Sequence, residues 1–223
     1  MTEQEKYQQL LTELRSKKGY ICDMDGVIYH GNRLLPGVKE FVSWLYEQRK
    51  SFLFLTNASE RSPKELQQKL LRLGLEVDES HFYTSAQATA KFIHSQAPGC
   101  SAYVIGGPGL VNALYDVGIT MNDVNPDYVV VGETNSYNYN MILKAVSLIN
   151  NGARLLFCKV RERAEPLTEF RKPGGDHGDR AHFREIFPKV RKRPDKLRPV
   201  VHAAAKDYLR VQHYARSGKA VKI

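Results

Sequence analysis

Two aspartates one residue apart, Asp23 and Asp25, stand directly after the apolar run 19–22 and directly before Gly26. Alternate residues of a strand share a face, so the two carboxylates start on the same side and can converge on one site. Gly26 lets the backbone turn sharply after the strand. Such a pair can bind a divalent cation, and one carboxylate can act as a nucleophile that forms an aspartyl-phosphate. A solvated loop that merely carries two acids is the alternative, and the apolar run before the pair disfavours it.

A second apolar run, residues 51–55, ends in Thr56 and Asn57, which can hydrogen-bond an oxyanion. Between the two runs, residues 35–45 carry apolar side chains at helical spacing. This order predicts a right-handed βαβ unit in which both strands end at one edge of a parallel sheet. Ligands of open α/β sheets bind at that edge, so we expect the Thr56 hydroxyl to lie beside the acidic pair.

These motifs, in this order, resemble the haloacid dehalogenase superfamily, and more narrowly its p-nitrophenyl-phosphatase-like branch, which carries an inserted cap. The resemblance runs from about residue 18 to 157. The segments that carry it are Asp23-x-Asp25-Gly26-Val27, Leu35-Pro36-Gly37, Leu55-Thr56-Asn57, 84–90, 104–110, 128–132, 139–145 and 152–157. It implies an α/β fold with an incomplete Rossmann-like parallel sheet as the core. The N-terminal part of that core is expected at residues 1–84, part of an α/β cap at 85–157, and an atypical basic tail at 158–223.

The resemblance also implies a role for each matching residue. Asp23 corresponds to the nucleophile that attacks phosphorus, and Asp25 to the acid and base that protonates the leaving oxygen and then activates water. Thr56 corresponds to the hydroxyl that positions the phosphate, with Asn57 and Gly26 in contact nearby. Mg²⁺ would be held by the Asp23 carboxylate and the Asp25 backbone carbonyl, with water and phosphate at the other positions. The implied activity is Mg²⁺-dependent hydrolysis of a small phosphorylated metabolite.

The resemblance stops near Phe157. After the cap the family has a lysine, usually in a Gly-Lys-Pro context, and then a Gly-Asp-x-x-x-Thr-Asp stretch that completes the metal site. Lys172-Pro173 and 175–179 imitate both motifs. They lie within eight residues of each other, however, where the family places a helix and a buried strand between them. A charged, glycine-rich surface loop is the plainer interpretation.

The composition changes at the same place. Residues 159–223 hold 18 of the 33 Lys and Arg and 8 of the 24 Asp and Glu, so they carry a net charge of +10 and the first 158 residues carry −1. Apart from 199–205 this segment has no apolar run of strand length, so we expect that it does not complete the core sheet. A reading-frame shift would explain why the family motifs end and the composition changes at the same place. A divergent tail is the other explanation.

The remaining sequence features exclude several classes of partner. The densest basic cluster, 189–198, lacks interleaved aromatic residues and a recognisable reading module, so we expect a solvated segment and no specific nucleic-acid partner. No stretch approaches the roughly 18 apolar residues of a membrane span. The three cysteines, Cys22, Cys100 and Cys158, have no metal-ligand spacing and are typical of reduced thiols in a cytoplasmic protein.

Two functions of different classes stay open. One is the phosphatase, favoured by the motifs in the first 60 residues. The other is a catalytically incomplete relative, either a truncated or frameshifted product or a non-enzymatic binding protein that uses the cap and the basic tail. Residues 85–157 also have an alternative fold, in which they continue the first sheet as one doubly wound domain. Within them, Gly106-Gly107-Pro108-Gly109 suggests a phosphate cradle, but we interpret it as a strand-to-helix turn.

Overall fold

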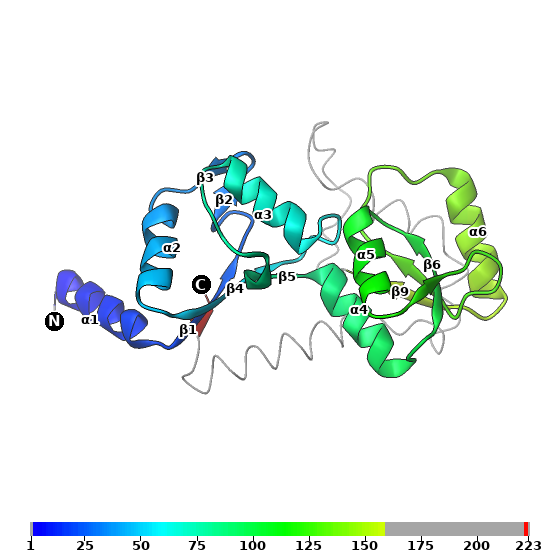
Figure 1. The fold of residues 1–223 in the computed structure, drawn as a ribbon, viewed down its shortest axis with the longest axis horizontal. Coiled ribbons are helices and arrows are strands. Elements are labelled where there is room, and N and C mark those ends of the chain that lie inside the picture. Colours follow the sequence, from blue (N-terminus) through cyan, green and yellow to red (C-terminus); the bar gives the residue numbers. More distant parts are fainter. Residues whose placement is uncertain (1, 159–220, 223) are drawn as a thin grey trace. The chain divides into compact units, whose positions relative to one another are not determined.

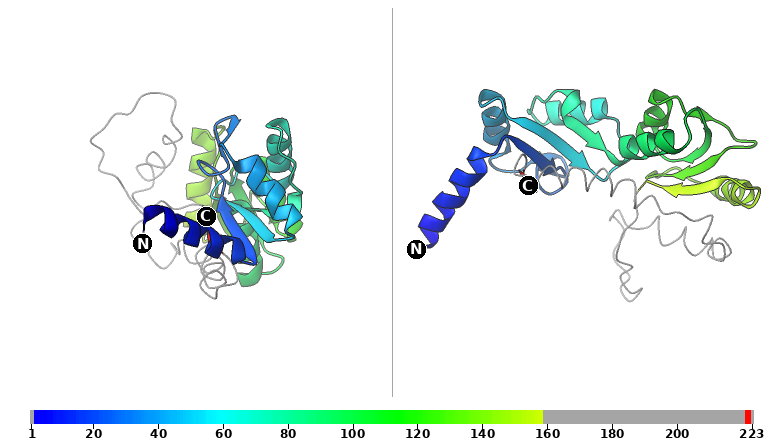
Figure 2. Two further views of the ribbon diagram at one scale, coloured as in Figure 1. Left: turned by 90° about the vertical axis from the view of Figure 1, so that its left-hand side faces the viewer. Right: turned by 90° about the horizontal axis from the view of Figure 1, so that it is seen from below.

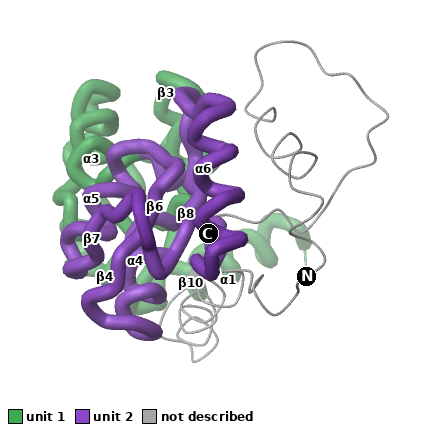
Figure 3. The backbone as a smooth tube through the Cα atoms, turned by 90° about the vertical axis from the view of Figure 1, so that its right-hand side faces the viewer, with its two compact units in different colours: residues 1–57, 61–84, 203–223 green, residues 58–60, 85–202 purple. Residues whose placement is uncertain are grey.

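The structure is a computed structural model that describes residues 2–158 and 221–222 (Figure 1). This part of the chain forms two separate four-stranded sheets, both parallel, and one two-stranded antiparallel hairpin. It divides into two compact units (Figure 3). The first unit holds residues 2–57, 61–84 and 221–222, and the second unit holds residues 58–60 and 85–158. The predicted α/β fold class with parallel sheets is confirmed.

The sheet of the first unit has the strand order β10-β1-β4-β5. Its strands are β1 (Gly19–Asp23), β4 (Ser51–Thr56), β5 (Phe82–Thr84) and β10 (Val221–Lys222). Helix α2 (Val38–Glu47) connects β1 to β4, as the predicted βαβ unit requires. Helix α3 (Pro63–Arg72) and the 3-10 turn η1 (Glu79–His81) connect β4 to β5. The two strands that end in the candidate site residues are therefore neighbours.

Helix α1 and a short hairpin are the other elements of the first unit. Helix α1 (Glu3–Ser16) begins with a capping box between Thr2 and Glu5, buries none of its residues and extends away from the sheet (Figure 2). At 14 residues it is the longest described helix, and none of the described helices combines the length and apolarity needed to cross a membrane. Strands β2 (Tyr29–His30) and β3 (Arg33–Leu34) form the antiparallel hairpin.

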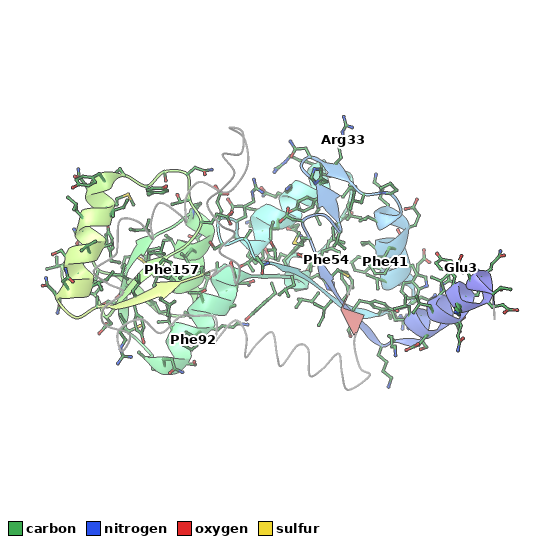
Figure 4. The ribbon with its side chains drawn as sticks, turned by 180° about the vertical axis from the view of Figure 1, so that it is seen from behind. Glu3, Arg33, Phe41, Phe54, Phe92 and Phe157 are labelled. Carbon is green, nitrogen blue, oxygen red and sulfur yellow. The ribbon has the colours of Figure 1, made fainter. Side chains whose placement is uncertain are left out.

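One face of the first sheet carries the apolar core that holds β1 and β4 in place. Tyr20 on β1 stands opposite Phe52 on β4, and its ring meets those of Phe41 and Trp44 edge-on, with centroids 5.8 and 5.6 Å apart. Figure 4 labels Phe54 on β4 and Phe41 on α2. Helices α2 and α3 contribute buried side chains to this apolar core, namely Val38, Val42, Leu45, Leu66 and Leu70. This packing fixes the strand ends from which the acidic pair projects.

The expectation that nothing after Phe157 joins the core sheet is wrong at Val221–Lys222. Strand β10 pairs in parallel with β1, with Val221 opposite Tyr20 and Lys222 opposite Ile21. The edge of β1 that does not face β4 offers backbone N–H and C=O groups, and any strand can pair with these whatever its side chains. The expectation rested on apolar runs, which a two-residue strand does not need. Residues 199–205 and the basic cluster 189–198 lie outside the described residues.

The second unit has its own sheet, with the order β7-β6-β8-β9. Its strands are β6 (Ser101–Ile105), β7 (Thr120–Met121), β8 (Tyr128–Val131) and β9 (Arg154–Phe157), and its helices are α4 (Ser85–Gln96), α5 (Pro108–Asp116) and α6 (Tyr139–Asn150). Because β5 and β6 lie in different sheets, the alternative of one continuous doubly wound sheet is not what the chain forms. The strand order reverses between β6 and β8, since β6 leads through α5 to β7 and β8 leads through α6 to β9.

All three cysteines are free and buried. Burial raises the pKa of the Cys22 and Cys158 thiols to about 12. A thiol with such a pKa is almost wholly protonated at neutral pH and is a poor nucleophile. The cysteines are therefore packing residues.

Candidate active site

The acidic pair stands on a tight turn that is anchored from inside the core. Asp23 ends β1 and is exposed, Met24 is fully buried, and Asp25 is exposed again. The Met24 carbonyl accepts hydrogen bonds from the backbone N–H groups of residues 27, 28 and 29 at 3.3, 2.9 and 3.3 Å. The backbone carbonyl of the buried Met24 therefore stabilises the turn, and both carboxylates lie at the edge of the sheet.

Gly26 makes this turn possible. Its φ is +82°, in the left-handed region that residues with a side chain rarely adopt. Its N–H donates to the Tyr29 carbonyl at 2.8 Å, which closes the turn. One residue before Asp25, the Met24 N–H donates to Asp23 Oδ1 at 2.7 Å and orients that carboxylate.

Thr56 and Asn57 end the neighbouring strand at the same edge. The register places Leu55 opposite Asp23, so Thr56 follows one residue further along β4. Thr56 is buried and Asn57 is exposed. The first unit thus brings all five predicted site residues, Asp23, Asp25, Gly26, Thr56 and Asn57, to one sheet edge. Two carboxylates, a hydroxyl and an amide at such an edge can bind and transfer a phosphoryl group.

Tyr29 is a residue of this site that the sequence analysis did not identify. It is only 3% exposed and its hydroxyl donates a hydrogen bond to Asp25. Burial, together with the negative charge of Asp25, raises the pKa of Tyr29. The hydroxyl therefore stays protonated and fixes the Asp25 carboxylate. Tyr29 belongs to a two-residue strand, which has no periodicity by which the sequence could reveal it.

The donor atoms at this edge fit Mg²⁺ as a partly protein-bound ion. No group of three or more His, Cys, Asp or Glu side chains that could hold a metal occurs among residues 2–158. Asp23 and Asp25 supply two carboxylates. Mg²⁺ at phosphoryl-transfer sites is commonly held by one or two carboxylates, with water and phosphate oxygens as the other ligands. The residues at this edge can therefore supply part of such a site.

Residues 58–60, which follow Asn57 directly, are part of the second unit. The Glu133 N–H donates to Ser59 Oγ at 2.9 Å, and the Gly109 N–H donates to the Glu60 carbonyl at 2.9 Å. Glu133 follows β8, and Gly109 lies in the first turn of α5, the helix that follows β6, so the segment fills the place at the strand ends where the order reverses. Open α/β sheets commonly bind ligands there. The Gly106–Gly109 turn therefore packs against the chain's own backbone.

We expect Gly107→Ala to destabilise the second unit by about 1–3 kcal/mol, because a methyl group has no room there. A Cβ at Gly107 would lie 2.9 Å from Glu60 Cγ and 3.1 Å from its Cα. The φ of Gly107 is −74°, which alanine adopts freely. Without the contact, the substitution would instead stabilise by about 0.4–1 kcal/mol. Urea unfolding measures the sign, with the exposed Asn112→Ala on α5 as the control, and a stabilised Gly107→Ala would contradict the packing.

Comparison with known proteins shows what this arrangement is similar to. Residues 20–120 match the family described as haloacid dehalogenase-like hydrolases. The ribonucleotide monophosphatase NagD of Escherichia coli K12 is 43% identical over 139 residues, which are 62% of this chain and 55% of that protein. A dihydroxyacetone phosphatase of Corynebacterium glutamicum is 39% identical over 137 residues, 61% of this chain and 50% of that protein.

Solved structures agree with these relatives. The structure of E. coli NagD superimposes on this chain with a TM-score of 0.60 at 42% identity. The match covers 64% of this chain and 56% of the NagD chain. A 4-nitrophenylphosphatase from Thermotoga maritima superimposes with a TM-score of 0.62 at 31% identity. The match covers 66% of this chain and 56% of that protein's chain. The chain thus spans about half the length of the curated relatives that it matches.

Proposed function

Because residues 20–120 match the haloacid dehalogenase-like hydrolase family, we propose that this chain carries the nucleophile-bearing part of a phosphomonoester hydrolase. The match confirms the resemblance seen in the sequence. The observation that carries the proposal is the shared sheet edge of β1 and β4. That edge presents two exposed carboxylates beside a threonine hydroxyl.

In the proposed mechanism the Asp23 carboxylate oxygen attacks phosphorus and forms an aspartyl-phosphate. The bond between phosphorus and the ester oxygen breaks, and Asp25 donates a proton to the leaving alcohol. Asp25 then accepts a proton from a water molecule whose oxygen attacks phosphorus. The bond to Asp23 breaks and inorganic phosphate leaves. The Tyr29 hydroxyl, hydrogen-bonded to Asp25, holds that carboxyl in place through both steps.

Mg²⁺ is the proposed cofactor, held by the Asp23 carboxylate and the Asp25 backbone carbonyl. When bound, it would offset the negative charge that the phosphate and the two aspartates bring together. Thr56 would donate a hydrogen bond to a phosphate oxygen, with Asn57 and the turn at Gly26 alongside.

Small phosphorylated metabolites are the proposed substrates. The relatives support this class, since they are named a ribonucleotide monophosphatase, a dihydroxyacetone phosphatase and a 4-nitrophenylphosphatase. We propose that the second unit is part of the cap that selects among such substrates. Three free, buried thiols support a reducing compartment such as the cytoplasm.

A catalytically incomplete relative is the second candidate, and one observation favours it. After residue 157, Lys172-Pro173 and 175–179 imitate the family's lysine and last acidic motif only within a span of eight residues. The lysine that the family places after the cap would normally balance the Asp23 and Asp25 carboxylates. A chain without it could retain phosphate binding and lose turnover.

The experiment that tests the proposed function is Mg²⁺-dependent release of phosphate from 4-nitrophenyl phosphate. We expect release to require Mg²⁺ and to stop with EDTA. We also expect Thr56→Val to lower kcat/KM by about 10²-fold, because a preorganised hydrogen-bond donor is lost. Thr56→Ser keeps the hydroxyl and should retain most of the activity. Equal kcat/KM in the valine and serine variants would exclude Thr56 from the phosphate site.

A further inference from the structure

A pocket of about 320 Å³ in the first unit has only positive charges in its lining. It is lined by Arg61, Lys69 and Arg72, with Asn32 and Leu73 completing the wall. Lys69 and Arg72 lie on α3, Arg61 lies just before it, and Asn32 lies between β2 and β3, which Figure 1 shows close to α3. No carboxylate lines the pocket.

None of the three cations, Arg61, Lys69 and Arg72, forms an ion pair with another residue of the described part of the chain. Burial, and then repulsion by the Arg61 charge, lower the pKa of Lys69, while Asp25 opposes this more weakly. Cations that repel one another around a pocket are relieved when an anion binds between them. The charge of the lining therefore selects for an anionic ligand.

Tyr29 connects this pocket to the acidic pair. The Lys69 ammonium group lies 3.5 Å from the centroid of the Tyr29 ring, while the hydroxyl of the same ring donates to Asp25. One aromatic side chain thus separates a pocket cation from the proposed catalytic acid. A small molecule whose phosphate is at Asp23 and Asp25 could extend a second group toward the pocket.

We propose that Arg61, Lys69 and Arg72 form an anion subsite that binds a second anionic group, a phosphate or a carboxylate, of the phosphoester substrate. Guanidinium groups bind such oxyanions in a bidentate manner, and an ammonium group binds them as a point charge. The Asn32 amide adds two N–H donors. The identity of the ligand as a substrate rests on the proposed function, whereas anion binding itself does not. The subsite narrows the substrate class to esters with two anionic groups.

The first experiment measures sulfate binding to the full chain without Mg²⁺. Backbone amide resonances of residues 61 and 69–73 report on this pocket separately from the basic tail. We expect saturable shifts, with affinity about tenfold lower in Arg61→Gln and in Lys69→Gln, because each loses a charge-assisted hydrogen bond. Lys64→Gln removes an exposed charge from α3 that does not line the pocket, and it should bind as the unchanged chain does.

Lys69→Arg keeps the charge and the contact with Tyr29, so it should retain binding if Lys69→Gln fails to fold. The absence of saturable shifts at these residues would overturn the proposal. So would an equal loss of affinity in the Lys64 and Lys69 variants, because a general field of positive charge, and no subsite, would then account for the binding.

The second experiment tests the ligand as a substrate group. Propyl phosphate, 1,3-propanediol bisphosphate and 3-phosphooxypropanoate are compared for binding to the full chain carrying Asp23→Asn, so that turnover does not interfere. At least one doubly anionic ester should bind about tenfold more tightly than propyl phosphate, and Lys69→Gln should remove that advantage. The preferred ester distinguishes a phosphate-binding from a carboxylate-binding subsite.

Equal affinity for the three esters would overturn the second-group assignment. Both binding assays are independent of hydrolysis. A chain that binds sulfate at Arg61 and Lys69 but never releases phosphate would refute the proposed function and leave the anion subsite standing. A chain that hydrolyses esters but shows no binding at this pocket would refute the anion subsite and leave the proposed function standing.

Discussion

Asp23→Asn is expected to abolish Mg²⁺-dependent phosphatase activity, with a drop of at least about 10³-fold in kcat. An amide is a poor nucleophile toward phosphorus, and it removes the negative charge that would help to hold Mg²⁺. Asp23 ends β1 with its Oδ1 hydrogen-bonded to the Met24 N–H, and asparagine can keep that bond through its own side-chain oxygen. The loss should therefore be chemical and not structural. The measurement is phosphate release from 4-nitrophenyl phosphate by protein purified free of host phosphatases.

Glu40→Gln is the matched control, since it removes one exposed carboxylate from α2 of the same unit. It should leave both activity and unfolding midpoint unchanged. Asp23→Ala is measured as well, because the asparagine of Asp23→Asn can deamidate slowly to aspartate and alanine cannot. Undiminished Mg²⁺-dependent turnover in the alanine variant would remove Asp23 from the role of nucleophile, and with it the mechanism in which Asp25 acts as acid and base.

The elements that carry the acidic pair could be predicted from the sequence because their apolar residues recur with a clear period. Strands β1 and β4 and helix α2 form where the apolar runs 19–22 and 51–55 and the helical spacing of residues 35–45 predict them. In each of these elements the burial of apolar side chains determines the structure, and the spacing of those side chains along the sequence indicates which of them are buried. The position of Thr56 followed from the same logic, since adjacent parallel strands end at one edge.

The parts that were missed depend on contacts between distant polar groups. Strand β10 was missed because its pairing with β1 uses backbone atoms and two residues only. Tyr29 lies after β1 and Arg61 lies just before α3, and the spacing of these two residues along the chain does not predict that they interact electrostatically. Lys69 and Arg72 did offer a signal, because residues three apart share one face of a helix. Like charges on that face of α3 therefore indicate two of the three cations of the anion subsite.

The 223-residue polypeptide is expected to be at most a feeble hydrolase, and replacement of residues 159–223 should raise its activity by orders of magnitude. The replacement is the carboxyl-terminal part of E. coli NagD, a relative of which the match to this chain covers 55%. Aspartyl-phosphate chemistry gathers the charges of Asp23, Asp25 and the phosphate in one place. The family offsets them with a lysine and a further acidic motif that completes the metal site. Losing one preorganised electrostatic partner costs about 10²–10³ in rate, and this sequence has neither motif at the family's spacing.

The comparison is made between the original chain and the chimera, each with and without Asp23→Asn, so that only Asp23-dependent turnover is counted. A large gain confined to the Asp23-containing chimera supports a complete mechanism that this chain carries only in part. Equal activity of the original chain and the chimera would contradict that view. Lys172 and Asp176 or Asp179 would then have to supply the missing charges despite their short spacing, and Lys172→Ala in the original chain should abolish its activity.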